Sequence, residues 1–230
     1  MATQTAASTS SAKPTPVQSS GRQLFSDRFV AWVNAHRQLT YWIAAVLVVG
    51  VVLFVWQLST QRRSEEIASR ELQGARFAFE NQNLPLAASE LARVIENYSG
   101  TNAAEEGRLL LANVRLLQGQ PQQAVEVLRD YAPRAGGAYR PQAYGLLGAA
   151  YENLGRFREA GEAYENGSAA ARLDFQKVQL LSDAGRAWTI AADTARAIAV
   201  YQRIVQDFPN EGAVTEAKVR LGELRKGTVS

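Results

Sequence analysis

The chain has 230 residues, of which 47% are hydrophobic, and a formal net charge of +3. It contains no cysteine, which excludes disulfides, thiol catalysis, thiolate metal sites and a lipid-bearing cysteine. Six basic residues and one acidic residue precede Ser64, whereas 19 basic and 21 acidic residues occupy the rest of the chain. The basic excess is therefore N-terminal, where it suits anionic lipid head groups, and the remainder lacks the charge of a nucleic-acid-binding domain.

Two polar segments of different character precede residue 41. Residues 1–21 are rich in Ala, Thr, Ser and Gln, a composition that predicts a disordered tail. Residues 22–40 carry large apolar residues at helical spacing, namely Phe25, Phe29, Trp32 and Val33. This spacing predicts an amphipathic helix on a membrane surface or, equally, a simple lead-in to the segment that follows.

Residues 41–58, with the sequence YWIAAVLVVGVVLFVWQL, are apolar almost throughout and uncharged. As a helix they would span about 27 Å, close to the hydrocarbon thickness of a bilayer. A buried core helix is usually shorter, and no small-residue cleavage pattern of a signal peptide follows Trp56. We predict one transmembrane helix that stays in the mature chain. No proline or turn cluster interrupts residues 61–82, so we expect this helix to continue into the first helix of the next domain.

From Ala68 onward the chain repeats a small residue followed four positions later by a larger one. The pairs are Ala87/Leu91, Ala124/Leu128, Ala160/Tyr164 and Ala197/Tyr201, whose alanines lie 37, 36 and 37 positions apart. The third unit has almost the full spacing of the tetratricopeptide signature, with Tyr144, Leu147, Gly148, Tyr151, Gly155, Ala160 and Tyr164. The repeats therefore resemble those of the tetratricopeptide family.

This resemblance implies an all-α fold, a right-handed α-solenoid of about four helical hairpins and a capping helix. We place the repeat domain at residues 62–226, with repeats at about 68–101, 105–138, 141–174 and 178–211 and the cap at 212–226. The helices of a hairpin approach closely where facing residues are small, as Gly148 and Ala160 would be, with Tyr151 and Tyr164 filling the space between them. Apolar residues expected to cover the last hairpin are Val214, Ala217, Val219, Leu221 and Leu224.

No constellation of reactive residues emerges from the sequence. The one histidine, His36, lies beside the span, which favours a membrane-interface residue over a metal ligand. The acidic pairs Glu105/Glu106 and Glu159/Glu162 are explained as solvated helix surface rather than as an acid/base pair. Since no strand is predicted, a phosphate-binding loop and a serine elbow lack their scaffold. We predict a protein that is not an enzyme and needs no metal or cofactor.

In tetratricopeptide domains the first helix of each hairpin lines the concave face. The resemblance therefore implies a protein-binding groove near Arg76, Phe79, Asn113, Leu116, Leu117, Glu152, Asn153, Arg186 and Thr189. Such a mixed lining suits a peptide or an extended protein segment. The Lys/Asn clamp of some family members is not matched, because Asn113 and Asn153 lack the accompanying lysines. Alternatively, Leu116 and Leu117 belong to the hydrophobic core.

The order of tail, single span and irregular repeats resembles the YfgM-like ancillary subunit of the bacterial Sec translocon. This resemblance implies a single-pass protein of the bacterial inner membrane, with a cytoplasmic N-terminus and a periplasmic repeat domain. It implies a chaperone-like binding module in protein transport, with translocon subunits, exported or unfolded polypeptide segments and envelope chaperones as partners. Nucleic acid and small-molecule substrates are not expected.

Two alternatives stay open at the level of sequence. The run YQRIVQDFPN at 201–210 resembles repeats of outer-membrane assembly factors, so a scaffold of another envelope assembly or secretion complex is the second hypothesis. The basic residues that flank the span do not choose its orientation, because they are balanced between Arg22, Arg28 and Arg37 before it and Arg62, Arg63, Arg70 and Arg76 after it.

Overall fold

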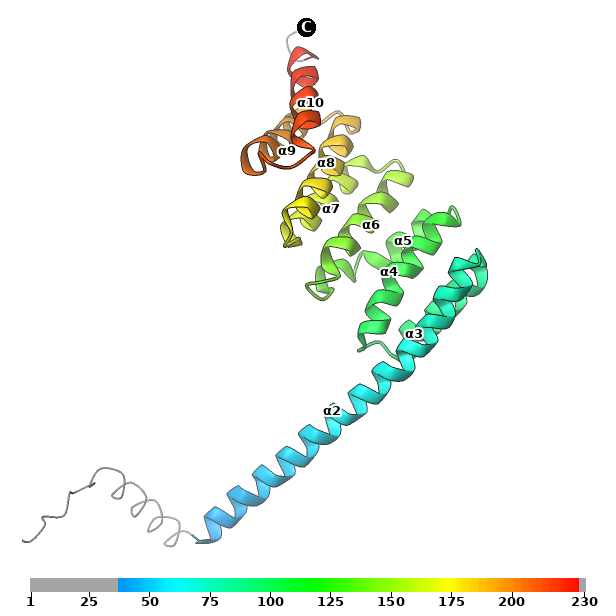
Figure 1. The fold of residues 1–230 in the computed structure, drawn as a ribbon, viewed down its shortest axis with the longest axis vertical. Coiled ribbons are helices and arrows are strands. Elements are labelled where there is room, and N and C mark those ends of the chain that lie inside the picture. Colours follow the sequence, from blue (N-terminus) through cyan, green and yellow to red (C-terminus); the bar gives the residue numbers. More distant parts are fainter. Residues whose placement is uncertain (1–36, 228–230) are drawn as a thin grey trace, which may run out of the picture. The chain divides into compact units, whose positions relative to one another are not determined.

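The computed structural model describes residues 37–227, which contain nine α-helices, one short 3-10 helix and no strand (Figure 1). The all-helical prediction is confirmed for this part of the chain. The predicted tail at 1–21, His36 and nearly all of the amphipathic segment at 22–40 lie outside the described residues. The chain divides into two compact units, one ending at Leu58 and one beginning at Ser59.

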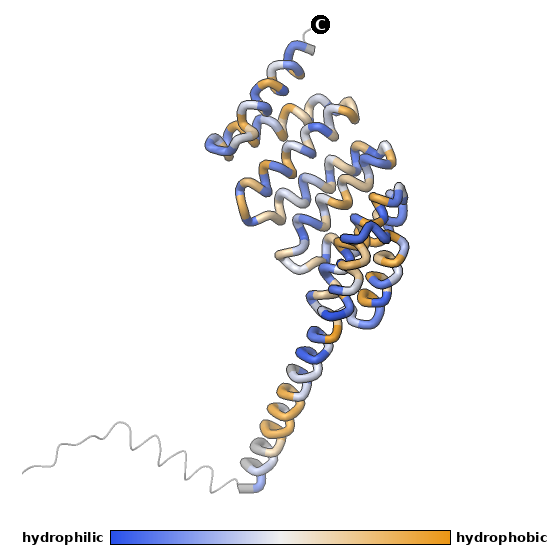
Figure 2. Tube along the Cα trace, turned by 45° about the vertical axis from the view of Figure 1, so that its right-hand side comes forward, coloured by the Kyte–Doolittle hydropathy of each residue, from blue (hydrophilic) through white to orange (hydrophobic). Residues whose placement is uncertain are grey.

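Helix α2 begins at Arg37 and ends at Glu80 without interruption. The predicted continuation of the apolar segment into the first repeat helix is therefore confirmed. Hydrophobic residues follow one another along the part of α2 that precedes Leu58 (Figure 2), and those whose side chains are described, including Tyr41, Trp42 and Trp56, are exposed. By length and composition, α2 is the one helix among the described residues that could cross a membrane.

The second unit is a series of antiparallel helix pairs. The C-terminal part of α2 pairs with α3 (Leu84–Asn97), and three more pairs follow in chain order: α4 (Asn102–Leu117) with α5 (Pro121–Leu128), α6 (Arg140–Asn153) with α7 (Phe157–Ala170), and α8 (Asp174–Ile190) with α9 (Thr194–Asp207). The 3-10 helix η1 (Ala132–Arg134) follows α5, and α10 (Val214–Gly227) packs against α9. Each helix packs against its neighbour in sequence, as a stack of hairpins requires.

The same turn joins the two helices of every pair. One residue in each turn has a left-handed backbone conformation, and these residues are Gln82, Gly119, Gly155 and Ala192. The next residue donates its N–H to the carbonyl five positions earlier, for example Asn83 to Ala78 at 2.9 Å and Asp193 to Trp188 at 2.9 Å. This is the Schellman arrangement, which satisfies the last carbonyls of the first helix. Gln82, Gly119, Gly155 and Ala192 are the turn residues of the four repeats.

Aromatic rings lie directly against glycines in the core. A Cβ atom on Gly148 would lie 2.6 Å from the ring of Tyr164, and one on Gly185 would lie 2.6 Å from the ring of Tyr201. The expected approach at Gly148, with Tyr164 filling the space, is therefore confirmed. Ala112 and Leu128 occupy the same two positions in the second hairpin, where both are fully buried. The side-chain volumes at these two positions compensate each other. Where the first helix has alanine instead of glycine, the second helix has leucine instead of tyrosine.

Helix α10 covers the last hairpin with one face. Val214, Ala217 and Leu221 are buried there, and Leu224 is partly buried against the same core. Val219, which we expected on this face, is 55% exposed. The expectation is wrong because a helical period of 3.6 residues places position 219 opposite positions 217 and 221.

Replacing Gly148 with Ala should lower the free energy of unfolding by about 1–3 kcal/mol, because the added methyl group overlaps the buried Tyr164 ring. Combining Gly148→Ala with Tyr164→Leu should recover most of the loss, since this pair reproduces Ala112 and Leu128 of the second hairpin. Urea denaturation of the full chain in mild detergent, followed by circular dichroism, measures both effects.

The matched control for this prediction is Gly222→Ala in the exposed part of α10, where an added methyl group meets nothing within 4 Å. This variant should be neutral or slightly stabilising, because alanine favours the helix. Equal stability of the Gly148→Ala variant and the wild type would contradict the packing argument.

Candidate functional site

Three hollows follow one another along the face formed by α2, α4, α6, α8 and α10. Their volumes are about 460, 370 and 500 Å³. The first and second share Gln142 and Leu146, and the second and third share Asp183. Neighbouring hollows share wall residues and therefore adjoin one another along the first helices of the hairpins; we call this row of hollows the inner groove.

The first hollow brings together three residues predicted from the sequence, Arg76 and Phe79 of α2 and Asn113 of α4. Leu110 and Leu146 add apolar surface to its wall, and Tyr139, which precedes α6, and Gln142 of α6 also line it. The guanidinium of Arg76 is ion-paired with the carboxylate of Glu106. The cation in this hollow is therefore already balanced by a carboxylate of the next helix.

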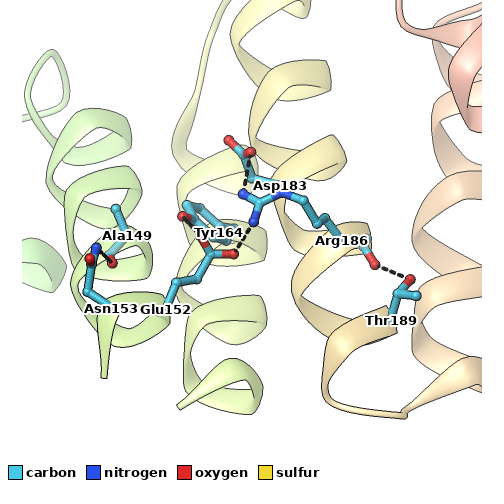
Figure 3. A network of polar contacts seen from close by, with 8 residues as sticks. Ala149, Glu152, Asn153, Tyr164, Asp183, Arg186 and Thr189 are labelled. Carbon is cyan, nitrogen blue, oxygen red and sulfur yellow. Dashed lines mark hydrogen bonds and ion pairs between the residues drawn. The ribbon is translucent and has the colours of Figure 1, made fainter. Parts of the chain in front are cut away.

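The third hollow contains Arg186 and Thr189, and Arg186 is the centre of a polar network (Figure 3). Its Nη1 donates to Glu152 Oε1 at 2.7 Å, and its Nη2 donates to Asp183 Oδ1 at 3.0 Å. The hydroxyl of Tyr164 donates to the other oxygen of Glu152 at 3.2 Å. Partial burial opposes the charge of Arg186, but the hydrogen bonds to Asp183 and Glu152 outweigh it and raise the pKa of the guanidinium. Glu152 thus joins two hairpins instead of offering a free charge.

The remaining predicted residues do not line the groove. Asn153 is exposed, and its Nδ2 donates to the carbonyl of Ala149 at 2.8 Å within α6. Leu116 is partly buried and packs against the core, which agrees with the alternative interpretation of this residue. Leu117 is 59% exposed at the end of α4 and contributes to none of the three hollows.

The sequence prediction missed the part of the groove nearer to the starts of the first helices. Three positions before Asn113, Ala149 and Arg186 lie the wall residues Leu110, Leu146 and Asp183. Seven positions before them lie Glu106, Gln142 and Gln179. Spacings of three and seven keep residues on one helix face, so helical periodicity applied to Asn113 and Arg186 would have found Leu110 and Glu106 of α4 and Asp183 and Gln179 of α8.

Both acidic pairs lie on helix surface that is at least partly exposed, as predicted. Glu159 and Glu162 form exposed ion pairs with Arg156 and Arg196. A backbone hydrogen bond and Arg156 lower the pKa of Glu159.

Glu105 and Glu106, which are partly exposed, also contact segments outside their own helix. Glu105 Oε2 accepts the Gly136 N–H at 3.0 Å, and Glu106 pairs with Arg76 of the preceding helix. Within residues 37–227, no three His, Cys, Asp or Glu side chains are arranged to hold a metal ion.

Comparison with known families identifies the fold. The model of the tetratricopeptide repeat-like domain matches residues 57–183, and that of the tetratricopeptide repeat matches residues 185–211. The chain belongs to the tetratricopeptide repeat-like family. No curated protein matches its sequence significantly.

Two of the matching solved structures share the fold at low sequence identity. The TPR-like repeats of a putative kinesin light chain from Podosopora anserina are 18% identical, with a TM-score of 0.56 over 72% of this chain and 88% of that chain. A point variant of the same protein is 17% identical, with a TM-score of 0.56 over 72% and 87%. The TPR2AB-domain:pHSP90 complex of yeast Sti1 is 12% identical, with a TM-score of 0.42 over 71% and 84%.

Stability of the repeat unit should fall at alkaline pH. Burial first, and then the charges of Glu152 and Asp183, raise the pKa of Tyr164. A pKa raised by folding gives stability that is present below about pH 10, the ordinary tyrosine pKa, and is lost as the pH rises further. Each such tyrosine contributes a slope of up to about 1.4 kcal/mol per pH unit.

In urea titrations between pH 8 and 12, the Tyr164→Phe variant should therefore lose stability less steeply than the wild type. Tyr131, whose pKa is raised by burial and by Glu105, remains in the variant and should keep part of the slope. If stability fell equally steeply with pH in the variant and the wild type, ionisation of Tyr164 would not contribute to the pH dependence.

Proposed function

We propose that this protein is a membrane-anchored binding module whose inner groove holds an extended segment of a partner polypeptide. The observation that supports this most directly is the continuity of the three hollows, which share Gln142, Leu146 and Asp183 along successive repeats. A continuous groove accommodates several residues of an extended chain. Proteins of this repeat family generally act as non-catalytic interaction scaffolds, so binding rather than turnover is the proposed activity.

The charges of the groove favour segments without strong net charge. Arg76 is paired with Glu106, and Arg186 is paired with Glu152 and Asp183. Because these cations are already neutralised, an acidic ligand would have to displace a bound carboxylate. The third hollow repeats this arrangement, since Arg220 pairs with Glu216 and Glu223. The groove is therefore suited to polypeptide of mixed sequence.

Amide side chains supply hydrogen bonds that do not depend on the sequence of the ligand. Asn113, Gln142 and Gln179 line the first two hollows, and each amide can both donate and accept. These groups match the N–H and C=O of an extended backbone. Phe79, Leu110 and Leu146 provide apolar contact beside them. This combination supports an unfolded polypeptide as the ligand.

The membrane anchor in this proposal is the apolar part of α2. Tyr41, Trp42 and Trp56 flank an uncharged run whose described side chains are exposed, an arrangement that water disfavours and lipid favours. Following the family resemblance, we place the N-terminus in the bacterial cytoplasm and the repeat domain in the periplasm. An anchored groove in that position would meet exported chains beside the translocon, together with envelope chaperones.

A scaffold of another envelope assembly or secretion complex is the second candidate. It is supported by the run at 201–210, which lies within the repeat matched at 185–211. Affinity capture in mild detergent separates the two candidates: translocon subunits co-purify in the first, and components of a different envelope complex co-purify in the second.

Removing two amides from the groove should weaken binding of an unfolded protein. Reduced carboxymethylated α-lactalbumin is a suitable probe, and fluorescence anisotropy measures its affinity for the full chain. The double variant Asn113→Ala with Gln142→Ala should bind about 5–30-fold more weakly, which corresponds to two hydrogen bonds of about 0.5–1 kcal/mol each.

The matched control replaces two exposed amides of α5 outside the three hollows, Gln122→Ala with Gln123→Ala. It should bind as the wild type does. An equal loss in both double variants, or no loss in either, would argue against binding in the inner groove.

Protease added to spheroplasts tests the proposed orientation. A tag after Ser230 should be lost from intact spheroplasts, because the repeat domain would be exposed to the periplasmic side. The same tag should also be lost after lysis. Protection until lysis would move the repeat domain and all its proposed partners to the cytoplasm.

A further inference from the structure

The first edge of the repeat stack exposes positions that the other repeats bury. Five positions before the turn residue, the four first helices carry Phe77, Val114, Ala150 and Ala187. The last three are 0% exposed, whereas Phe77 is 69% exposed. The largest apolar side chain of the set is thus the one that is left uncovered.

Two further positions on the same face of α2 show the same difference. Ile67 is 46% exposed, whereas Ala104 at the equivalent position of α4 is fully buried. Gly74 is exposed, whereas its equivalent Leu111 is buried. Spacings of seven and three residues place Ile67, Gly74 and Phe77 along one stripe of the helix.

The repeats themselves show what kind of element covers such a stripe. On α4 the covering element is α3, the second helix of the preceding hairpin. Leu91 and Ile95 of α3 approach Gly107 of α4 within 3.9 Å and 3.6 Å of its Cβ position, and Ala88 packs in the same cluster. On α2 no helix of the described part of the chain takes this place. A covering helix would therefore present a small residue followed three and seven positions later by large apolar ones.

A carboxylate lies at this edge without a partner. Eight positions after the turn residue, the second helices carry Glu90, Val127, Ala163 and Val200, so only the first repeat has a charge there. The Oε2 atom of Glu90 is buried and has no hydrogen-bond partner, and it lies 3.7 Å from the Cβ position of Gly74. A buried carboxylate oxygen without a donor is costly, and a cation brought by a ligand would remove the cost.

We propose that the stripe of Ile67, Gly74 and Phe77, together with Glu90, docks an amphipathic helix of a different protein. That helix continues the repeat stack by one element. It carries the small, +3, +7 apolar pattern and a lysine or arginine that reaches Glu90. We call this surface the open edge. It is separate from the inner groove, so the two binding events are independent.

Charge and packing argue against a second copy of this chain as the occupant. A two-fold contact across Gly74 would bring two Glu90 carboxylates together, which is repulsive. A head-to-tail contact would need a free last hairpin, but Val214, Ala217 and Leu221 of α10 already cover it. The outward face of α10 has one large apolar side chain, Val219, whose helical neighbours Thr215, Gly222 and Glu223 are not large apolar residues, so it offers no apolar stripe to the open edge.

Photocrosslinking in the native membrane tests this proposal. p-Benzoylphenylalanine replaces Phe77 in the full chain, and the control carries it in place of Gln122 on the exposed surface of α5. We expect one main adduct at position 77, absent from the control. Sequencing of the crosslinked peptide should show a helix of another protein with the small, +3, +7 pattern and a basic residue nearby.

The carboxylate is tested in the same assay. Glu90→Gln should lower the yield of that adduct at least threefold, whereas the matched change Glu126→Gln on α5 should leave it unchanged. The Asn113→Ala and Gln142→Ala double variant should also leave it unchanged, so loss of the groove and loss of the open edge are distinguishable. Crosslinks to lipid only, to a second copy, to residues 1–36 of this chain or to a segment without the pattern would overturn the proposal, as would no adduct above the control.

Discussion

Close contact between a residue without a side chain and an aromatic ring is the constraint on which the repeat stack depends. Within hairpins it joins Gly148 to Tyr164 and Gly185 to Tyr201, and between hairpins the indole of Trp188 lies over Gly161. A Cβ at any of these glycines would overlap a buried ring. The spacing of the hairpins follows from these contacts, and the spacing in turn sets the width of the inner groove.

Ion pairs determine the electrostatics of the groove, and two of them join neighbouring first helices. Arg76 of α2 reaches Glu106 of α4, and Arg186 of α8 reaches Glu152 of α6. These pairs hold adjacent hairpins in register and at the same time remove free charge from the groove. What remains for a ligand is amide and apolar surface, which recognises a polypeptide backbone more readily than a particular charged sequence.

The two ends of the repeat stack differ in whether another helix covers them. The last hairpin is closed by α10, whose buried residues satisfy the apolar face that every terminal repeat leaves open. The first hairpin has no such cover among the described residues; it exposes Phe77 and holds Glu90, whose Oε2 atom has no hydrogen-bond partner. The exposed aromatic residue beside Ile67 is the basis of the partner surface proposed above.

The sequence by itself determined the helical repeats, because small and large residues recur at a fixed interval and only paired helices satisfy that pattern. It also determined the apolar segment at 41–58, and it identified Arg76, Phe79, Asn113, Arg186 and Thr189 as groove residues through the family pattern. It did not determine which side chains are paired. The sequence predicts Glu105 and Glu106 as surface acids, and only tertiary packing brings them to the Gly136 N–H, which follows η1, and to Arg76 of α2. Exposure of Phe77 is likewise a tertiary property, since it depends on a covering helix that the pattern within one repeat does not specify.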